Sequence, residues 1–370
     1  MATRGWRMNS EIIYLYMYDI GDPVSAAELD GLFRNQEDFS KYEFRRPEPE
    51  EIATFDVPHI FNLKDEVLAV GEAQHRFKVQ VAVYTFGSFS IRIRYQIEGG
   101  PHSQLVKITF DPKINEFVRE IVSRSKKKIE AALMKIRAVK ISATMETYRF
   151  YYIEGEKNQI LPKARKMIAG LLVDEKDADT LEEEYIEYIL GKSISYDSGS
   201  ILFVGWESAV MIDKEYQHEQ ELLIAEISNL QLLEMRIYHA VLAKELDTAS
   251  RSMRRIGVGS ASVLRKADTS QINRSLGSVY DNTRAVLNNI NDTVFGFGEW
   301  YLARVYSLFS SVFKLDTLKV SMERDLEAID NERKFVSDME VSRHESFLEL
   351  LVVFLIVVEI VLELLFLAKG

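Results

Sequence analysis

The distribution of proline divides this chain into two parts that are expected to fold differently. All seven prolines lie within the first 162 of the 370 residues, and the remaining 208 residues contain none. Proline fixes the backbone, lacks an N–H donor and interrupts helices. The proline-free part is therefore expected to form long uninterrupted helices, whereas the first part should contain turns and loops.

The clearest pattern in the first part is an alternation of apolar and polar residues with a period of two. It covers residues 77–83 and 89–97, with Gly87-Ser88 as a tight link between them. Such alternation is typical of strands with one face buried and the other in water, so we expect an antiparallel sheet. Residues 106–110 continue the series, and residues 195–212 supply a turn and an apolar strand that ends the sheet.

These patterns predict an α+β fold with a mainly antiparallel N-terminal sheet, then long helices and a C-terminal transmembrane helix. The predicted domains are an α+β domain over 1–212, a helical bundle or coiled-coil region over 213–345, and an anchor over 346–370. Within the helical region, residues 251–278 are rich in Ser, Gly and Arg and are the best candidate for a linker. A seven-residue repeat that predicts a coiled coil or a partner-facing stripe is formed by Leu315, Met322, Ile329 and Val336.

The end of the chain predicts a membrane anchor. Residues 347–368 number 22, of which 19 are apolar. A helix of this length covers about 33 Å, enough for a hydrocarbon core of about 30 Å. We therefore expect a single-pass C-terminal anchor with the N-terminal domain in the cytoplasm. The alternative is a helix buried in the protein core.

Two glutamates lie within the predicted membrane helix. Glu359 and Glu363 are i,i+4 neighbours on one helix face. Carboxylates in lipid must face protein or water, or be protonated. We therefore expect helices of several copies to cover this face, which predicts a homo-oligomer; a proton or ion path is the alternative.

Two basic stretches are candidate binding surfaces on a chain whose net charge is −11. Lysine and arginine suit partners that carry phosphate, so RNA or an anionic lipid is the predicted partner, besides protein. A solvated helix face is the alternative explanation. The candidate contact residues are Arg124, Lys126, Lys127, Lys128, Lys135, Arg251, Arg254, Arg255, Arg265 and Lys266.

No motif of the sequence points to a reaction. The chain has no cysteine, its six histidines are scattered, and it contains no His-Glu-x-x-His or Gly-x-Ser-x-Gly pattern. We therefore predict no catalytic residue, no metal and no cofactor, and identify no small-molecule substrate. An enzyme whose site is assembled from carboxylates of distant segments stays open as an alternative.

Two segments of the chain resemble a known family. The strand ILFVGWESAVMI and the closing HESFLELLVVFLIVVEIVLELL, with Glu359 directly after Leu355-Ile356-Val357-Val358, are similar to the "required for meiotic nuclear division" family. The resemblance covers mainly residues 195–212 and 300–366. It implies an α+β N-terminal domain, a helical C-terminal half and a terminal apolar segment. It also implies a membrane-held scaffold, since eukaryotic members are associated with mitochondrial membranes and the upkeep of mitochondrial translation, and it supplies no catalytic residues.

The sequence as a whole predicts a non-enzymatic, membrane-anchored oligomeric scaffold whose cytoplasmic α+β domain binds a partner. One alternative is a membrane tether that binds RNA or anionic lipid through the basic surfaces. The other is an enzyme with an active site that the sequence does not reveal.

Overall fold

A computed structural model describes the backbone of residues 7–21, 23–33, 40–42, 58–71, 73–135, 141–214, 218–257, 266–295 and 300–367. The chain divides into two structural units. The first contains Met1–Arg236 and Asn288–Leu318, and the second contains Ile237–Leu287 and Lys319–Gly370. These boundaries differ from the predicted ones at residues 212 and 345, because the first unit takes in two stretches of the helical half.

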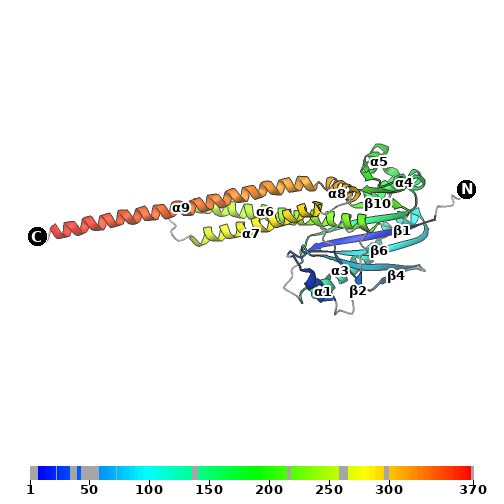
Figure 1. Cartoon of the computed structure of the whole chain (residues 1–370), viewed down its shortest axis with the longest axis horizontal. Helices are drawn as coiled ribbons and strands as arrows, with labels where there is room; N and C mark the ends of the chain where they lie inside the picture. The colour runs from blue at the N-terminus through cyan, green and yellow to red at the C-terminus, as the bar shows by residue number, and fades with distance from the viewer. Residues whose placement is uncertain are drawn as a thin grey trace. The chain divides into compact units, whose positions relative to one another are not determined.

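The first unit is built on one β-sheet, which has ten strands within the described residues (Figure 1). The strand order is β2-β3-β5-β6-β1-β7-β10-β9-β8, and β4 pairs with β5 beside this path. Neighbouring strands are antiparallel except β7 and β10, which pair in parallel. The strands are β1 (Arg7–Asp19), β2 (Ser40–Tyr42), β3 (His59–Asn62), β4 (Glu66–Val70), β5 (Ala73–Tyr84), β6 (Ser88–Pro101), β7 (Met145–Glu154), β8 (Ser193–Ile194), β9 (Ile201–Val204) and β10 (Ser208–Asp213).

Helices cover both faces of this sheet. They are α1 (Ala26–Phe33), α2 (His102–Thr109), α3 (Pro112–Leu133), α4 (Lys157–Leu172), the 3₁₀ turn η1 (Ala178–Thr180), α5 (Glu183–Leu190), the first part of α6 (Glu219–Gly257) and α8 (Trp300–Phe313). One face is apolar and forms the main core with α2, α3 and α4. The sheet and its helices agree with the α+β class expected from the sequence.

Helix α3 shows how local sequence sets the elements of this core. Its N-cap is Asp111, whose side chain accepts hydrogen bonds from the backbone N–H groups of Lys113 and Ile114 at 2.8 and 3.3 Å. Pro112 occupies the first turn, where its missing N–H costs nothing. The buried residues Ile114, Val118, Ile121, Val122 and Ile129 follow helical spacing and face the sheet.

The second face of the sheet is also buried, which corrects the prediction of a face in water. Arg92 and Arg94 alternate with the apolar residues of β6, and they are only 1% and 8% exposed. The first part of α6 lies over this face, together with α8, whose Phe309 and Phe313 pack against Tyr148 of β7. Alternation in the sequence therefore reports the two faces of the strand, but not which face meets water.

Two segments differ from the predicted strands. Residues 106–110 lie largely in α2, where Leu105, Ile108 and Thr109 are buried at the spacing of a helix face. Residues 195–212 contain two strands, β9 and β10, in place of one. They are separated at Gly205, where a Cβ would lie only 2.7 Å from the carbonyl oxygen of Leu172.

The second unit consists of helices. The rest of α6 lies beside α7 (Lys266–Phe295) and α9 (Leu315–Leu367), and the three helices share polar contacts. Ser275 donates to Glu245 at 2.9 Å, His239 lies 3.3 Å from Asp325, and Arg333 contacts Asn273 at 3.4 Å. Much of the segment 251–278, the expected linker, lies in α6 and α7.

The seven-residue repeat of α9 is buried in the described part of the chain. Leu315, Met322, Ile329 and Val336 are at most 2% exposed. Helix α9 is separated from α8 at Lys314, a non-glycine residue with φ of 53°. The proline-free part, expected to form long uninterrupted helices, is thus broken here at a residue in the left-handed conformation, which is rare for residues other than glycine.

The predicted transmembrane anchor is wrong, since no helix in the described part of the chain is long and apolar enough to cross a membrane. The exposed carboxylates of Glu349 and Glu359 bound an uninterrupted apolar run of nine residues. Nine residues cover about 13.5 Å of helix, against a hydrocarbon core of about 30 Å. The predicted single-pass membrane localisation is wrong for the same reason, and so is the prediction that Glu359 and Glu363 act inside a membrane.

Candidate functional site

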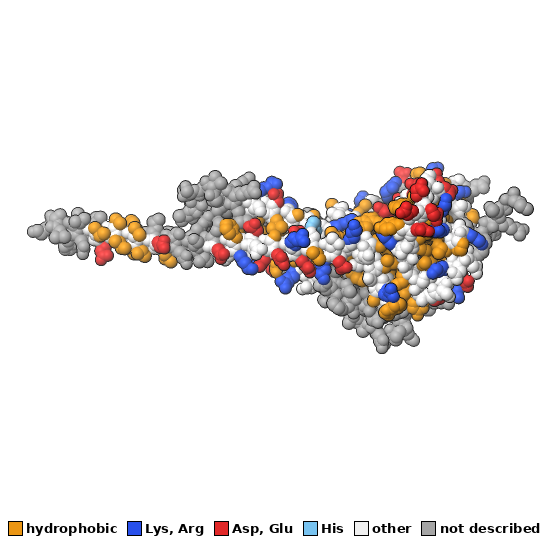
Figure 2. All heavy atoms as spheres, turned by 90° about the horizontal axis from the view of Figure 1, so that it is seen from above, with side chains coloured by type: hydrophobic (Ala, Val, Ile, Leu, Met, Phe, Trp, Pro, Cys, Tyr) orange, Lys and Arg blue, Asp and Glu red, His pale blue; other side chains and the backbone are white. Residues whose placement is uncertain are grey.

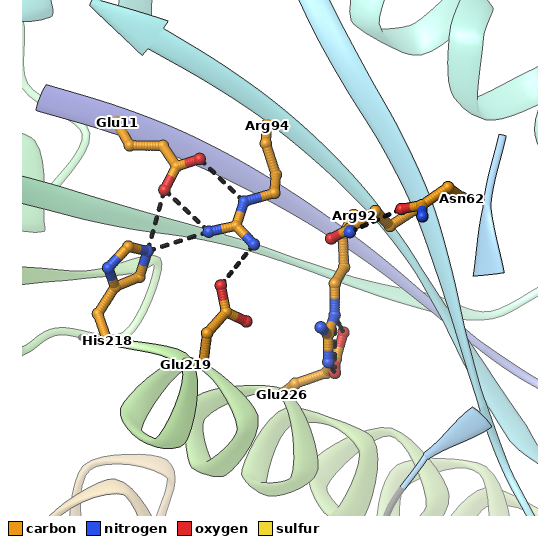
Figure 3. A network of polar contacts seen from close by, with 8 residues as sticks. Glu11, Asn62, Arg92, Arg94, His218, Glu219 and Glu226 are labelled. Atoms are coloured by element: carbon orange, nitrogen blue, oxygen red, sulfur yellow. Dashed lines mark hydrogen bonds and ion pairs between the residues drawn. The ribbon is translucent and has the colours of Figure 1, made fainter. Parts of the chain in front are cut away.

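The densest group of charged side chains lies between the second face of the sheet and the first part of α6 (Figure 3). We call it the buried charge cluster. It combines two arginines of β6 with one glutamate of β1 and a histidine and two glutamates at the start of α6. Its members are Glu11, Arg92, Arg94, His218, Glu219 and Glu226.

Arg94 binds two carboxylates at once. Its Nε and Nη2 donate to the two oxygens of Glu11 at 2.8 and 3.0 Å, and its Nη1 donates to Glu219 at 2.6 Å. Burial alone would lower the pKa of Arg94, but the two carboxylates raise it, so the guanidinium stays charged. The bidentate geometry with Glu11 is the arrangement in which an arginine–carboxylate pair is strongest.

Glu11 is held in its charged form by its neighbours. Its Oε2 lies 2.9 Å from Nε2 of His218. Burial would raise the pKa of Glu11, but the hydrogen bonds from His218 and Arg94 lower the pKa to about 2. The His218 ring also stacks on Tyr152, with ring centroids 4.5 Å apart, so the start of α6 is fixed to β7 as well as to β1.

Arg92 forms the second half of the cluster. Its Nε donates to Glu226 Oε1 at 2.9 Å, and its Nη2 and the Tyr84 hydroxyl both bind Glu226 Oε2. The Arg92 and Glu226 side chains are 1% and 0% exposed. Burial would lower the pKa of Arg92, but Glu226 raises it. A guanidinium enclosed in this way reaches no solvent-borne substrate in this conformation.

Glu234 is the exception among the carboxylates that α6 presents to the sheet. It accepts a hydrogen bond from Ser88 Oγ at 3.0 Å. Burial, with a smaller contribution from the negative charge of Asp19, raises the pKa of Glu234 to about 8. Glu234, which is buried, therefore carries its proton at neutral pH.

The geometry of the buried charge cluster favours attachment of α6 to the sheet over catalysis. The cluster places α6 because Arg92 and Arg94 lie two residues apart on β6, while Glu219 and Glu226 lie seven apart on α6, so each pair occupies one face. Sequence reasoning missed this complementarity, although the spacing of both pairs is visible in the sequence. Among the described residues, no group of three or more His, Asp or Glu is placed to hold a metal ion.

The predicted basic contact residues lie in different surroundings. Arg124 of α3 pairs with Glu66 at 3.2 Å and with Glu120 at 3.6 Å, and Lys126 lies over the Tyr18 ring at 4.4 Å. Lys127, Lys128 and Lys135 are exposed. In the second unit, Arg251 pairs with Asp247 at 2.7 Å. Outside the described residues or side chains are Arg254, Arg255, Arg265, Lys266 and Glu363.

The second candidate site is a surface of α9, which we call the apolar segment and define as residues 348–360. Figure 2 shows apolar side chains exposed along this helix. Their exposed fractions range from 37% to 63%. The exposed apolar residues are Leu348, Leu351, Val352, Val353, Phe354, Leu355, Ile356, Val357, Val358 and Ile360.

Comparison with known proteins finds sequences that are similar to this chain. The chain is 20% identical to "Uncharacterized protein MJ0711" of Methanocaldococcus jannaschii over 263 residues, or 70% of this chain and 78% of that protein. It is 30% identical to "Topoisomerase 1-associated factor 1" of Aspergillus terreus over 139 residues, or 36% of this chain but 11% of that protein. No solved structure shows a significant match.

These matches do not connect the chain to the "required for meiotic nuclear division" family, and that resemblance stays a prediction. The family model described as "Uncharacterized protein MJ0711, N-terminal domain" matches residues 9–219. The matched region runs from β1 to the start of α6 and includes Glu11, Arg94 and His218. Since it covers more than half of the sequence, the chain belongs to this family.

Proposed function

We propose that this protein is a non-enzymatic scaffold that assembles with further copies of itself through the apolar segment of α9. The observation that carries this proposal is the exposure of ten large apolar side chains within residues 348–360. Leu, Ile, Val and Phe gain roughly 1.5–3 kcal/mol each when fully buried, so leaving ten of them in water is costly. Exposed apolar surface of this extent is typical of an interaction site.

The distribution of these side chains around the helix favours several helices as the covering partner. Val352, Val353, Phe354 and Leu355 are consecutive, and each is more than half exposed. Consecutive residues of a helix point about 100° apart, so the stretch between Glu349 and Glu359 is apolar on all sides. A helix that is apolar all round is normally enclosed on all sides.

A second copy of the chain is favoured as the occupant by the repeat of α9. The seven-residue spacing of Met322, Ile329 and Val336 is interrupted by Arg343 and resumes at Leu350 and Val357. In this register Glu349 and Glu359 fall on outer positions of a coiled coil, where carboxylates stay in water. Each further copy brings the same repeat in the same register, which suits a closed symmetric assembly.

The non-enzymatic part of the proposal is supported by the buried charge cluster. Glu11, Glu219 and Glu226 each bind an arginine, so these carboxylates are occupied inside the first unit. A general acid or base must reach the proton that it transfers. The α+β unit is then the part that each copy displays to a partner.

Sedimentation of the full chain tests the proposal through a matched pair of variants. Phe354→Glu places a charge in the apolar segment, at a residue that is 63% exposed. Phe335→Glu makes the same change on the same helix outside the segment, at a residue that is 53% exposed. We expect wild type and Phe335→Glu to sediment as the same oligomer, and Phe354→Glu to sediment as a monomer of 42.6 kDa.

The opposite outcomes would refute the proposal. A monomeric wild-type chain at micromolar concentration would show that the apolar segment does not join copies of the chain. An oligomer that persists in Phe354→Glu would place the contact elsewhere. Circular dichroism of both variants distinguishes lost assembly from lost helix.

A further inference from the structure

An open groove lies in the second unit, between α7 and α9. Its volume is about 560 Å³. Known small-molecule sites measure roughly 300–1,000 Å³, so the groove has the size of one. Its lining consists of Asn273, Arg274, Gly277, Ser278, Asp281, Asn282 and Arg333.

Arg333 is held in place across α7. It contacts Asn273 Oδ1 through Nε at 3.4 Å, and its guanidinium lies over the Tyr280 ring at 5.8 Å. A guanidinium offers five N–H donors in a planar fork, and the contact with Asn273 uses one of them. Arg333 thus enters the groove as an ordered donor group, with less conformational freedom to lose on binding than a mobile side chain.

Gly277 keeps the groove open beneath this guanidinium. A Cβ at residue 277 would lie 3.5 Å from Nη2 of Arg333, and any longer side chain would occupy the space between the helices. Glycine inside a helix costs about 1 kcal/mol relative to alanine. Because 3.5 Å is ordinary van der Waals contact, alanine would also fit at residue 277, and only longer side chains would fill the groove.

The lining combines two kinds of binding group. Arg274 and Arg333 supply guanidinium forks, which match the oxygens of a phosphate. The amides of Asn273 and Asn282, the Ser278 hydroxyl and the Asp281 carboxylate supply donors and acceptors for hydroxyl groups. The described lining includes no aromatic ring, so it offers a nucleobase nothing to stack on.

We propose that this groove binds a phosphorylated sugar or a similar small phosphorylated polyol. The phosphate lies against Arg274 and Arg333, and the hydroxyl groups are read by Ser278, Asp281 and Asn282. The site is independent of the proposed self-assembly, because its lining ends at Arg333 and the apolar segment begins at Leu348. Each proposal can therefore fail while the other stands.

Calorimetric titration of the full chain tests the groove. The probes are glucose 6-phosphate, ribose 5-phosphate and glycerol 3-phosphate, with glucose and inorganic phosphate as partial ligands. At least one phosphorylated polyol should bind more tightly than either partial ligand. Arg274→Gln and Arg333→Gln should each weaken that binding by about ten- to a hundred-fold, as expected for a lost charge-assisted hydrogen bond.

The matched control is Arg324→Gln, which removes the same charge from an exposed residue of α9 outside the groove. It should leave the affinity unchanged. Because Arg274 is exposed on α7, Arg274→Gln should keep the fold and so gives a result even if Arg333→Gln does not fold. Three results would overturn the assignment: no phosphorylated polyol binds, inorganic phosphate binds equally well, or Arg324→Gln weakens binding as much as Arg274→Gln.

Discussion

At the scale of single residues, the charged side chains of the buried charge cluster pair with one another inside the first unit. A buried ion pair repays the loss of hydration only when its geometry is good, and replacing it with apolar residues is often neutral. Arg92 with Glu226 and Arg94 with Glu219, the two pairs that join β6 to α6, therefore matter less for net stability than for specificity. They admit one placement of α6 on the sheet, because a shift along the helix would leave buried charges without partners.

The protonation of Glu234 leads to a prediction of how the free energy of unfolding depends on pH. Burial raises its pKa from 4.5 to about 8, so between these pH values the folded chain keeps a proton that the unfolded chain has lost. The stability that Glu234 contributes is fully present below pH 4.5 and is lost as the pH rises toward 8. Glu234→Gln should remove this loss and raise the free energy of unfolding at pH 8 by on the order of 4 kcal/mol.

Urea unfolding at pH 5, 6, 7 and 8 measures this effect. The difference in free energy of unfolding between Glu234→Gln and wild type should grow with pH. Glu184→Gln, which changes an exposed glutamate of α5 in the same unit, should show no such trend. A constant difference across the four pH values would mean that Glu234 is not protonated in the folded chain.

The sequence indicates which residues are charged but not where they are paired. The alternation of Arg92 and Arg94 with apolar neighbours correctly predicts the strand, but it wrongly predicts that the face with the arginines is exposed to solvent. Only the position of α6, more than 120 residues later in the chain, decides that this face is buried. Long-range pairing of this kind leaves no local pattern, and a cluster built from β1, β6 and α6 therefore went unpredicted.

At the scale of elements, the periodic segments were predicted best. The two strands around Gly87 and the seven-residue repeat of α9 both appear where the spacing indicates them. Short segments were predicted less well, since Val106 and Ile108 at alternate positions fit a strand but belong to α2. The break at Lys314 had no signal, because no glycine or proline marks it.

The buried repeat of α9 makes a prediction about the second unit. Ile329 is fully buried, so Ile329→Ala should lower the free energy of unfolding by about 2–5 kcal/mol. Val320→Ala removes two methyl groups from a residue of the same helix that is 54% exposed, and should cost about 0.5 kcal/mol or less. Urea unfolding followed by circular dichroism measures both; equal losses would mean that the repeat does not form the core of this unit.

At the scale of the whole molecule, the proposed function depends on the exposed apolar segment of α9. The apolar composition of the last residues is evident in the sequence, but taken alone it wrongly predicts a membrane anchor. The exposed carboxylates of Glu349 and Glu359 leave an uninterrupted run of only nine apolar residues. Such a run is too short to cross a membrane, yet its roughly two and a half turns of helix can pack against other helices.

The absence of cysteine from the chain allows the most direct test of self-assembly. Phe354 is the midpoint of the apolar segment, so copies meet there whether their helices run parallel or antiparallel. A single Phe354→Cys substitution should yield, after mild oxidation at micromolar concentration, a disulfide-linked species of twice the 42.6 kDa chain mass. Phe335→Cys, at a residue of α9 that is 53% exposed and lies outside the segment, should stay monomeric under denaturing conditions. No cross-linked species from Phe354→Cys, or equal cross-linking from both variants, would contradict the assembly of this protein through α9.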